Sequence, residues 1–428
     1  MNAIRSKITI FGLLSLLIGT LPAWAQEEEA TLNSGDTAWM LVAAVLVLLM
    51  TLPGLALFYG GLVRAKNVLS ILIQCFVIAA VMSIIWVVYG YSFAAGEGNK
   101  FFGDASMLML KHMGADTVNG SIPESVFVTF QMTFIIITPA LIVGAFAERM
   151  KFSAVLIFTI LWVTFSYLPI WHMAWGGGLF ADWDVIDFAG GTVVHINAGI
   201  AGLVACIMLG KRKGFPGPNL APHNVAYTVI GASLLWVGWF GFNAGSELAA
   251  DGVAGFAMIT TQIATAAAVL GWIALEWMIS KKPTAVGAAT GAVAGLVAIT
   301  PASGSTTVTG ALVIGLASGV VCYFCATSLK RALGYDDSLD VFGVHGIGGI
   351  VGAILTGVFL REVPEGGIGP QVIAQFKSVV LTIVWSGVVA FVALLIAKVT
   401  VGLRVSEDDE NSGLDLTYHG EEAYNTEG

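Results

Sequence analysis

The chain has 428 residues, of which 57% are hydrophobic and 11% are charged, and its formal net charge is −9. Soluble domains carry about 25% charged residues, so this composition excludes a water-soluble protein and indicates an integral membrane protein. The 52 glycines exceed the usual share of about 7%, and glycine in apolar segments favours close packing of helices. Much of the negative charge lies at residues 27–29 and 407–422, outside the apolar part, so the net charge says little about binding partners.

The first 25 residues have the pattern of a cleavable secretory signal peptide. Arg5 and Lys7 precede an apolar run from Ile8 to Leu21, and the small-residue pattern Ala23-Trp24-Ala25 then precedes the polar Gln26. We expect cleavage after Ala25 and a mature N-terminus outside the cytoplasm. The alternative is an uncleaved first span, but the apolar run is shorter than the ~20 residues that a span needs.

Eleven further apolar runs are long enough to cross a membrane, which predicts an all-α integral membrane protein. The runs cover residues 39–59, 68–93, 126–147, 152–171, 188–209, 225–242, 253–278, 284–300, 308–327, 342–360 and 372–401. We expect one transmembrane domain over residues 26–402, with halves at about 39–209 and 225–360, a last helix at about 372–401 and a tail at 403–428. An odd number of spans places the two mature ends on opposite sides of the membrane.

Basic residues concentrate in alternate loops and in the tail. The richer set is Arg64, Lys66, Arg149, Lys151, Lys211 to Lys213, Lys281, Lys282, Lys330, Arg331 and Arg404. The other loops and the margins of their spans hold Lys100, Lys111, Arg361 and Lys377. Because cytoplasmic loops carry an excess of lysine and arginine, the richer set predicts a cytoplasmic tail and an outer N-terminus.

A histidine motif, His-x3-Gly-x2-Gly, occurs in both the fifth and the tenth predicted span. Its two copies are His195, Gly199 and Gly202, and His345, Gly349 and Gly352. In each copy the glycines lie on the histidine's own helix face, so the two faces can approach closely. The two spans run in opposite directions, which is typical of an inverted repeat that encloses a site near the bilayer midplane.

We expect the two imidazoles to meet inside the membrane. Each histidine lies only one or two turns from the start of its span, so a meeting requires sunken or bent helix starts. Gly190, Gly191, Gly343 and Gly346 give the backbone that freedom. Ionisable groups deep in a span are costly and indicate function, although a single one is often only a packing residue. Neutral imidazoles can both donate and accept, so two rings can line a path for a small polar molecule or a proton.

Two carboxylates stand just before the histidine spans. For Asp340 we expect a capping role at the start of its helix, where a carboxylate is favoured. For Asp187 two interpretations stay open, because a buried carboxylate near an entrance could cap the helix or stabilise a cation outside the pore.

Aromatic residues gather near the predicted outer ends of the spans. Phe130 and Phe134 lie in the third span, and Trp175 lies in a Trp-Gly-Gly-Gly turn after the fourth. Facing aromatic rings attract a desolvated cation by about 1 to 2 kcal/mol each. The alternative is the aromatic belt that lines the interface of any membrane protein.

Five segments carry a resemblance to one known family. They are PGLALFYGGLVRAKNVLS at 53–70, DFAGGTVVHINAGIAGL at 187–203, GWFGFNAGS at 238–246, DVFGVHGIGGIVG at 340–352 and the tail GLRVSEDDENSGLDLTYHGEEAYN at 402–425. These segments resemble ammonium transporters of the Amt/Mep/Rh family, and specifically its bacterial Amt branch. The resemblance covers essentially the whole mature chain.

The resemblance implies an eleven-helix protomer, built as an inverted five-helix repeat plus a final helix, in a homotrimer with a pore in each protomer. It also implies a bacterial inner-membrane location with a periplasmic N-terminus, and a cytoplasmic tail at which a PII-type signal protein docks. By similarity, the site consists of an ammonium-recruitment group, a phenyl gate, twin pore histidines and a supporting carboxylate. The recruitment group is Phe130, Phe134, Trp175 and Ser246, and the phenyl gate is Phe134 with Phe242. The twin pore histidines are His195 and His345, and the supporting carboxylate is Asp187.

We therefore expect a transporter or channel that recruits ammonium outside, removes a proton near the gate and conducts ammonia past the two histidines, with methylammonium as an analogue. An intact ammonium ion would cost from ~3 to above 10 kcal/mol at an apolar midplane. We expect no enzymatic activity, cofactor, metal or nucleic-acid partner. Two alternatives stay open: a membrane cytochrome whose two histidines ligate one haem iron, and a sensor that binds ammonium without conducting it.

Overall fold

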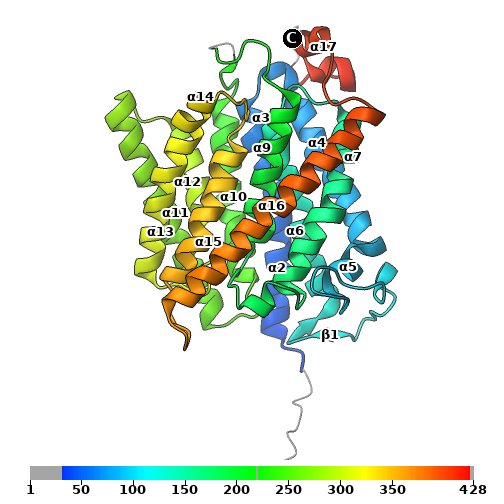
Figure 1. Ribbon diagram of the computed structural model, residues 1–428, viewed down its shortest axis with the longest axis vertical. Helices are drawn as coiled ribbons and strands as arrows, with labels where there is room; N and C mark the ends of the chain where they lie inside the picture. The colour runs from blue at the N-terminus through cyan, green and yellow to red at the C-terminus, as the bar shows by residue number, and fades with distance from the viewer. Residues whose placement is uncertain (1–30, 218–219, 425–428) are drawn as a thin grey trace, which may run out of the picture.

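The structure is a computed structural model that describes residues 31–217 and 220–424. The predicted signal peptide at 1–25 therefore lies outside the described residues. Figure 1 shows helices that stand side by side in one bundle. Strands in the described part are confined to a small antiparallel hairpin of β1 (Val118–Asn119) and β2 (Ile122–Pro123).

Nine helices among the described residues are long and apolar enough to cross a membrane, and two shorter apolar helices complete the predicted set of eleven spans. The first four spans consist of α2 (Ser34–Leu49), η1 (Met50–Leu55) and α3 (Ala56–Leu62); η2 (Ala65–Asn67), α4 (Val68–Ile85), η3 (Trp86–Gly90) and α5 (Tyr91–Ala95); α6 (Glu124–Phe146); and α7 (Phe152–Trp162), η5 (Val163–Tyr167) and α8 (Leu168–Trp175). Each span lies within a few residues of its predicted run, because a helix in lipid must be apolar along its whole length.

The remaining spans follow in the same manner. They consist of η7 (Gly191–Ile196) and α9 (Asn197–Leu209); α10 (Val225–Gly245); α11 (Gly252–Ser280); α12 (Ala285–Ile299); α13 (Val308–Phe324), η9 (Cys325–Leu329) and α14 (Lys330–Leu333); η10 (Phe342–Gly346) and α15 (Ile347–Val358); and α16 (Ile368–Thr400). The connecting segments hold the short turns η4 (Leu108–Leu110) and η6 (Ala181–Trp183). α16 crosses the bundle diagonally and lies against α7, α9 and α15 (Figure 1).

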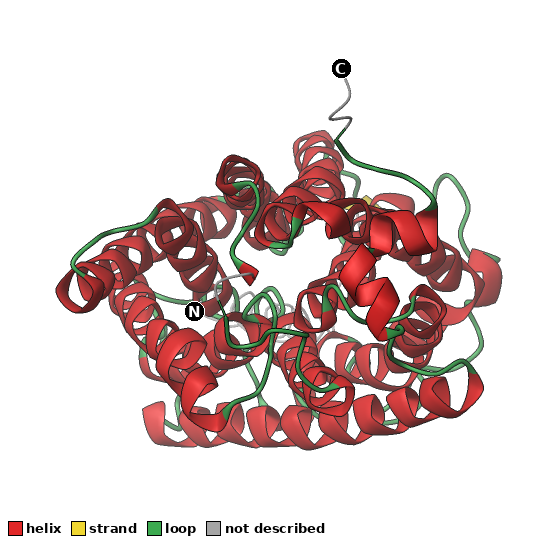
Figure 2. Cartoon of the chain, turned by 90° about the horizontal axis from the view of Figure 1, so that it is seen from above, coloured by secondary structure: helices red, strands yellow, loops and turns green. Residues whose placement is uncertain are grey.

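The two ends of the described chain lie at opposite ends of the bundle. α2 begins beside β1, whereas the tail with α17 (Glu407–Ser412) and η11 (Asp415–His419) covers the other end (Figure 1). We call these ends the N-terminal face and the C-terminal face. Seen from above, the helices lie around one another, one long helix runs across one side, and loops join their ends (Figure 2).

The spans that carry the duplicated motif begin irregularly. η7 and η10 are both π-helical turns, and Gly190 before η7 has φ 115°, a backbone conformation that favours glycine. π-helical turns are frequently found at functional sites, but η1, η3, η5, η9 and η11 are also π-helical. Each motif histidine therefore lies in an irregular turn at the start of its span.

Glycine lets the two motif helices touch. A Cβ atom on Gly199 would lie 2.2 Å from the backbone nitrogen of Gly346, so no other residue fits there. Gly349 likewise packs on the η7 turn. Gly352 does not face the other copy. It packs against the carbonyl oxygen of Ala298 in α12, where a side chain would not fit. The glycine face of the second copy therefore serves two neighbours, of which only one carries the other histidine.

Candidate functional site

The structure brings the two motif histidines into contact in the middle of the chain's helical bundle. His195 lies in η7 and His345 in η10, and their Nδ1 atoms are 3.3 Å apart. Their rings stack with centroids 5.4 Å apart and planes 20° apart. Both side chains are buried. One Nδ1 must donate and the other accept, so in neutral rings one Nε2 is left as an acceptor and the other as a donor.

The buried carboxylate of Asp187 caps the first turn of the His195 span. Its Oδ1 accepts hydrogen bonds from the backbone nitrogens of Gly190 (3.0 Å) and Gly191 (2.5 Å). Its Oδ2 accepts from the backbone nitrogen of Thr192 at 2.8 Å and from the hydroxyl of the same residue. The positive end of a helix favours this charge. The backbone oxygen of Asp187 also accepts from Nε1 of Trp175 at 2.8 Å, so one residue holds the histidine turn and the tryptophan together.

The capping role expected for Asp340 is wrong. The carboxylate of Asp337 accepts from the backbone nitrogen of Phe342 at 2.7 Å, whereas Asp340, which has φ 60°, pairs with the ammonium group of Lys330. The loop approaches η10 in a left-handed conformation, and that geometry puts the earlier aspartate in reach of the helix start. Sequence position alone does not reveal this offset.

Four aromatic rings lie together on the N-terminal side of the histidines. Phe134 is at their centre, with its ring centroid 5.0 Å from that of Phe130, 6.0 Å from that of Trp175 and 4.2 Å from that of Phe242. Phe134 and Phe242 stack at 28° and are both fully buried. The ring of Phe242 in turn stacks on that of His195 with centroids 6.1 Å apart, so the aromatic group continues to the histidine pair.

Ser246 ends α10 on the same side and is partly exposed. Its hydroxyl donates a hydrogen bond to the backbone oxygen of Phe242 at 2.8 Å. A hydroxyl that donates to the helix keeps its oxygen lone pairs as acceptors, so it can receive an N–H group or a cation from the N-terminal side.

Trp239 is a site residue that sequence reasoning missed. Its ring stacks on His195 with centroids 5.4 Å apart and planes 21° apart, and its Nε1 donates to Oγ1 of Thr300 at 2.9 Å. A signal was available, because Trp239, Phe242 and Ser246 are three and four residues apart and so share one helix face.

The histidines lie between a very small cavity and a larger one. Leu235, Val293, Phe242 and both histidines line an enclosed space of about 10 Å³, which is the size of one water molecule. A second cavity of about 170 Å³ extends from His345 toward the C-terminal face. Within the described part of the chain, Nε2 of His195 has no hydrogen-bond partner. The small cavity is therefore lined by apolar side chains and the two imidazoles, whereas Ser338 and the carboxylate of Asp340 line the larger one.

The geometry does not suit a haem between the two histidines. A metal–imidazole nitrogen bond is about 2.0 Å, so two axial ligands of one iron lie about 4 Å apart with a porphyrin between their rings. The Nδ1 atoms are closer than that, and the rings are in stacking contact. No group of three or more potential metal ligands occurs among residues 31–217 and 220–424.

The fold and this site define a multi-pass helical membrane transport protein. A model of the Ammonium Transporter Family matches residues 38–424. The chain belongs to the ammonium transporter family.

Relatives match over nearly the whole chain. It is 48% identical over 403 residues to the ammonium transporter of Bacillus subtilis (strain 168), which covers 92% of this chain and 99% of that protein. It is 47% identical over 422 residues to the ammonium transporter of Aquifex aeolicus (strain VF5), a match that covers 97% of this chain and 99% of that protein. The solved structure of Candida albicans Mep2 matches with a TM-score of 0.83 and 33% identity over 89% of this chain and 88% of that one. A Sensor Amt Protein matches with a TM-score of 0.85 and 29% identity over 90% and 98%.

Proposed function

We propose that the protein transports ammonium by binding it at the N-terminal face, removing one proton and passing ammonia between the two cavities along His195 and His345. The observation that carries the proposal is the contact between the two imidazoles within a space the size of one small molecule. Ammonia is of that size, and it can both donate and accept hydrogen bonds.

Recruitment rests on the aromatic group and on Ser246. The faces of Phe130, Phe134 and Trp175 attract a cation by about 1 to 2 kcal/mol each when it is desolvated. The lone pairs of the Ser246 hydroxyl add an acceptor for one N–H of ammonium. Asp187 supports this site indirectly, because its carboxylate is taken up by the η7 turn while its backbone oxygen holds Trp175.

Deprotonation precedes the passage through the stacked phenyl rings. An intact ammonium ion in this apolar path would cost from ~3 to above 10 kcal/mol, whereas ammonia carries no charge. Past the gate of Phe134 and Phe242, ammonia meets one imidazole nitrogen that accepts and another that donates. The released proton either returns to the N-terminal face or follows by a relay through the histidines and water. Potassium has no proton to lose, so it would have to cross the apolar path as a charged ion, and it is therefore excluded.

The membrane orientation follows from the charges. The lysines and arginines of the richer set lie in the loops of the C-terminal face and in the tail, so this face is cytoplasmic and the N-terminal face is periplasmic. The location is the bacterial inner membrane, and the signal peptide is cleaved after Ala25. N-terminal sequencing of the purified protein tests the cleavage site.

The assembly and the partner also belong to this proposal. The resemblance supports a homotrimer with one pore in each protomer and a PII-type signal protein bound at the C-terminal face. The acidic helix α17 presents exposed carboxylates at this face. Native mass spectrometry of the purified protein, alone and with such a partner, tests both parts.

The function is tested by flux into liposomes that contain the purified protein. Ammonium or methylammonium pulses should produce uptake or an internal alkaline shift that is faster than in empty liposomes. Binding of ammonium without flux would instead favour the sensor. Electrical recording of the same liposomes on a supported membrane then shows whether net charge crosses with each ammonia.

A further inference from the structure

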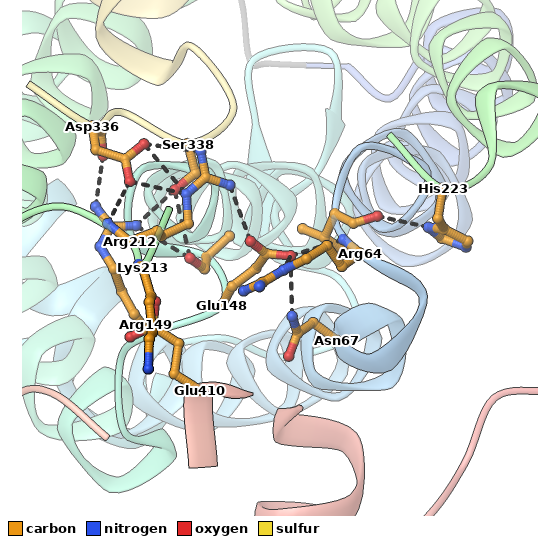
Figure 3. A network of polar contacts seen from close by, with 12 residues as sticks. Arg64, Asn67, Glu148, Arg149, Arg212, Lys213, His223, Asp336, Ser338 and Glu410 are labelled. Carbon is orange, nitrogen blue, oxygen red and sulfur yellow. Dashed lines mark hydrogen bonds and ion pairs between the residues drawn. The ribbon is translucent and has the colours of Figure 1, made fainter. Parts of the chain in front are cut away.

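Arg149 is fully buried in the loop between α6 and α7 at the C-terminal face, and it forms no ion pair with any residue in the described part of the chain (Figure 3). Instead, all of its hydrogen bonds go to four backbone oxygens and one hydroxyl. The accepting atoms and distances are Gly210 O (2.9 Å), Ala147 O (3.2 Å), Ala145 O (3.2 Å), Asp336 O (2.6 Å) and Ser338 Oγ (2.6 Å). A planar guanidinium with five donors can hold such a set in fixed geometry, whereas a lysine ammonium cannot.

The partners of Arg149 belong to the two spans that carry the histidines. Gly210 is the residue that ends α9, and α9 continues directly from the turn that holds His195. Asp336 and Ser338 lie in the loop that leads into η10, which holds His345. One side chain therefore joins the end of the first histidine span to the beginning of the second.

The positive charge of Arg149 is balanced by the carbonyl oxygens at the ends of two helices and by the other hydrogen-bond acceptors around it. The carbonyl oxygens at the ends of α6 and α9 carry partial negative charge, so they favour a cation. Burial lowers the pKa of Arg149 to about 10, which leaves it charged at neutral pH.

A separate ion network holds the surrounding loops. The carboxylate of Asp336 forms two hydrogen bonds with Arg212 at 2.9 Å, and Arg212 also pairs with Glu148 at 3.0 Å, which in turn pairs with Arg64 at 2.9 Å (Figure 3). We therefore expect these ion pairs to hold the loops in place when Arg149 is substituted. This arrangement makes the contribution of Arg149 itself measurable.

We propose that Arg149 is a positioning residue of the pore, whose guanidinium fixes the separation of the two histidine spans at the C-terminal face. This inference rests on the proposed function. Because Ser338 and Asp340 also line the larger cavity beside His345, a shift of this loop changes the exit of the path and the contact between the imidazoles. The recruitment site at the N-terminal face is not touched by this change.

The test compares Arg149→Lys with Arg404→Lys in liposome flux. Arg404 is a matched control, because its guanidinium also bonds the end of α9, at Leu209 O (3.0 Å), but otherwise pairs with Glu410 of the tail and makes no hydrogen bond to the loop at 336–338. We expect Arg149→Lys to lower the maximal rate on the order of tenfold, as small misplacements of a reacting geometry do. The half-saturating ammonium concentration of Arg149→Lys should stay within about twofold of the wild-type value. Arg404→Lys should keep the wild-type maximal rate.

Ser338→Ala gives a second measurement that does not depend on the arginine variant's folding. It removes one acceptor of Arg149 and should lower the maximal rate about threefold in the wild-type background but not further in the Arg149→Lys background, since the two variants break one shared contact. Thermal unfolding midpoints of all variants are measured alongside.

Three outcomes would overturn the inference while leaving the proposed function intact: an unchanged maximal rate in both Arg149→Lys and Ser338→Ala, an equal loss in Arg404→Lys, or a change only in half-saturation. Absence of flux in the wild-type protein would instead contradict the proposed function itself.

Discussion

The Nδ1 atoms of His195 and His345 lie 3.3 Å apart, although the two residues are separated by 150 positions in the chain. Two π-helical turns and one glycine contact make this approach possible. In a bundle of apolar helices, this pair supplies the polar groups of a small cavity that is otherwise lined by aromatic and aliphatic side chains.

The glycine contact is the first point to test. In Gly199→Ala, the new methyl group would lie 2.2 Å from the backbone nitrogen of Gly346, so the two histidine helices must separate. We expect a loss of about 1 to 3 kcal/mol of stability, as in other overpacked cores, together with a large loss of transport. Gly255→Ala is the matched control, because a methyl group there meets nothing within 4 Å. Equal transport by the two variants would show that the close approach is not required.

Trp175 is expected to contribute to ammonium binding rather than to passage. Replacing it by leucine removes one cation–π contact of about 1 to 2 kcal/mol, so Trp175→Leu should raise the half-saturating ammonium concentration about tenfold. Concentration-dependent flux measures this change. Trp183→Leu provides the comparison, because Trp183 lies at the same face but stacks on Phe180 and faces Lys377 instead. A similar increase in both variants would remove Trp175 from the recruitment site.

Asp337 should make the folded state sensitive to pH. Burial, reinforced by the Asp340 carboxylate, raises the pKa of Asp337 from 3.8 to about 6, although Lys330 acts in the opposite direction. Cys206, Tyr59 and Tyr335 are the other titratable groups nearby.

The folded protein therefore keeps the Asp337 proton up to about pH 6, whereas the unfolded chain loses it near pH 3.8. The resulting stabilisation is complete below pH 3.8 and is lost as the pH rises through 6, and it amounts to about 3 kcal/mol.

Thermal unfolding in detergent between pH 4 and pH 7 checks this prediction. The wild-type midpoint should fall as the pH rises, and Asp337→Asn should lose most of that fall. Asp182→Asn, at a half-exposed aspartate of the N-terminal face, should keep the wild-type slope. If Asp337→Asn follows the wild-type curve, the raised pKa does not govern stability.

The sequence predicts the helices and the meeting of the histidines because both depend on strong local signals. Lipid requires long apolar runs, and the duplicated glycine register reveals which faces approach. The π-helical turns were not predictable in detail, because a shift of one hydrogen bond along a helix leaves no mark in an apolar sequence.

Features that depend on which loops meet were beyond the sequence. Arg149 reads as one more cytoplasmic basic residue, and only the folded structure shows that it reaches the ends of two distant spans. The same reason explains the error at Asp340, where a left-handed turn gives the capping position to Asp337. The sequence leaves two interpretations open for Asp187, and in the structure its carboxylate accepts hydrogen bonds from the η7 turn.

The central claim is that the histidine pair conducts ammonia and keeps other cations out. The most direct measurement is the current and flux that ammonium and potassium pulses produce in liposomes on a supported membrane, for the wild-type protein, His195→Ala and His345→Ala. We predict that each substitution lowers the maximal ammonium flux or removes the preference for ammonium over potassium, because it takes away one of the two polar partners in the narrowest part of the path. Unchanged flux and unchanged selectivity in both variants would contradict the account.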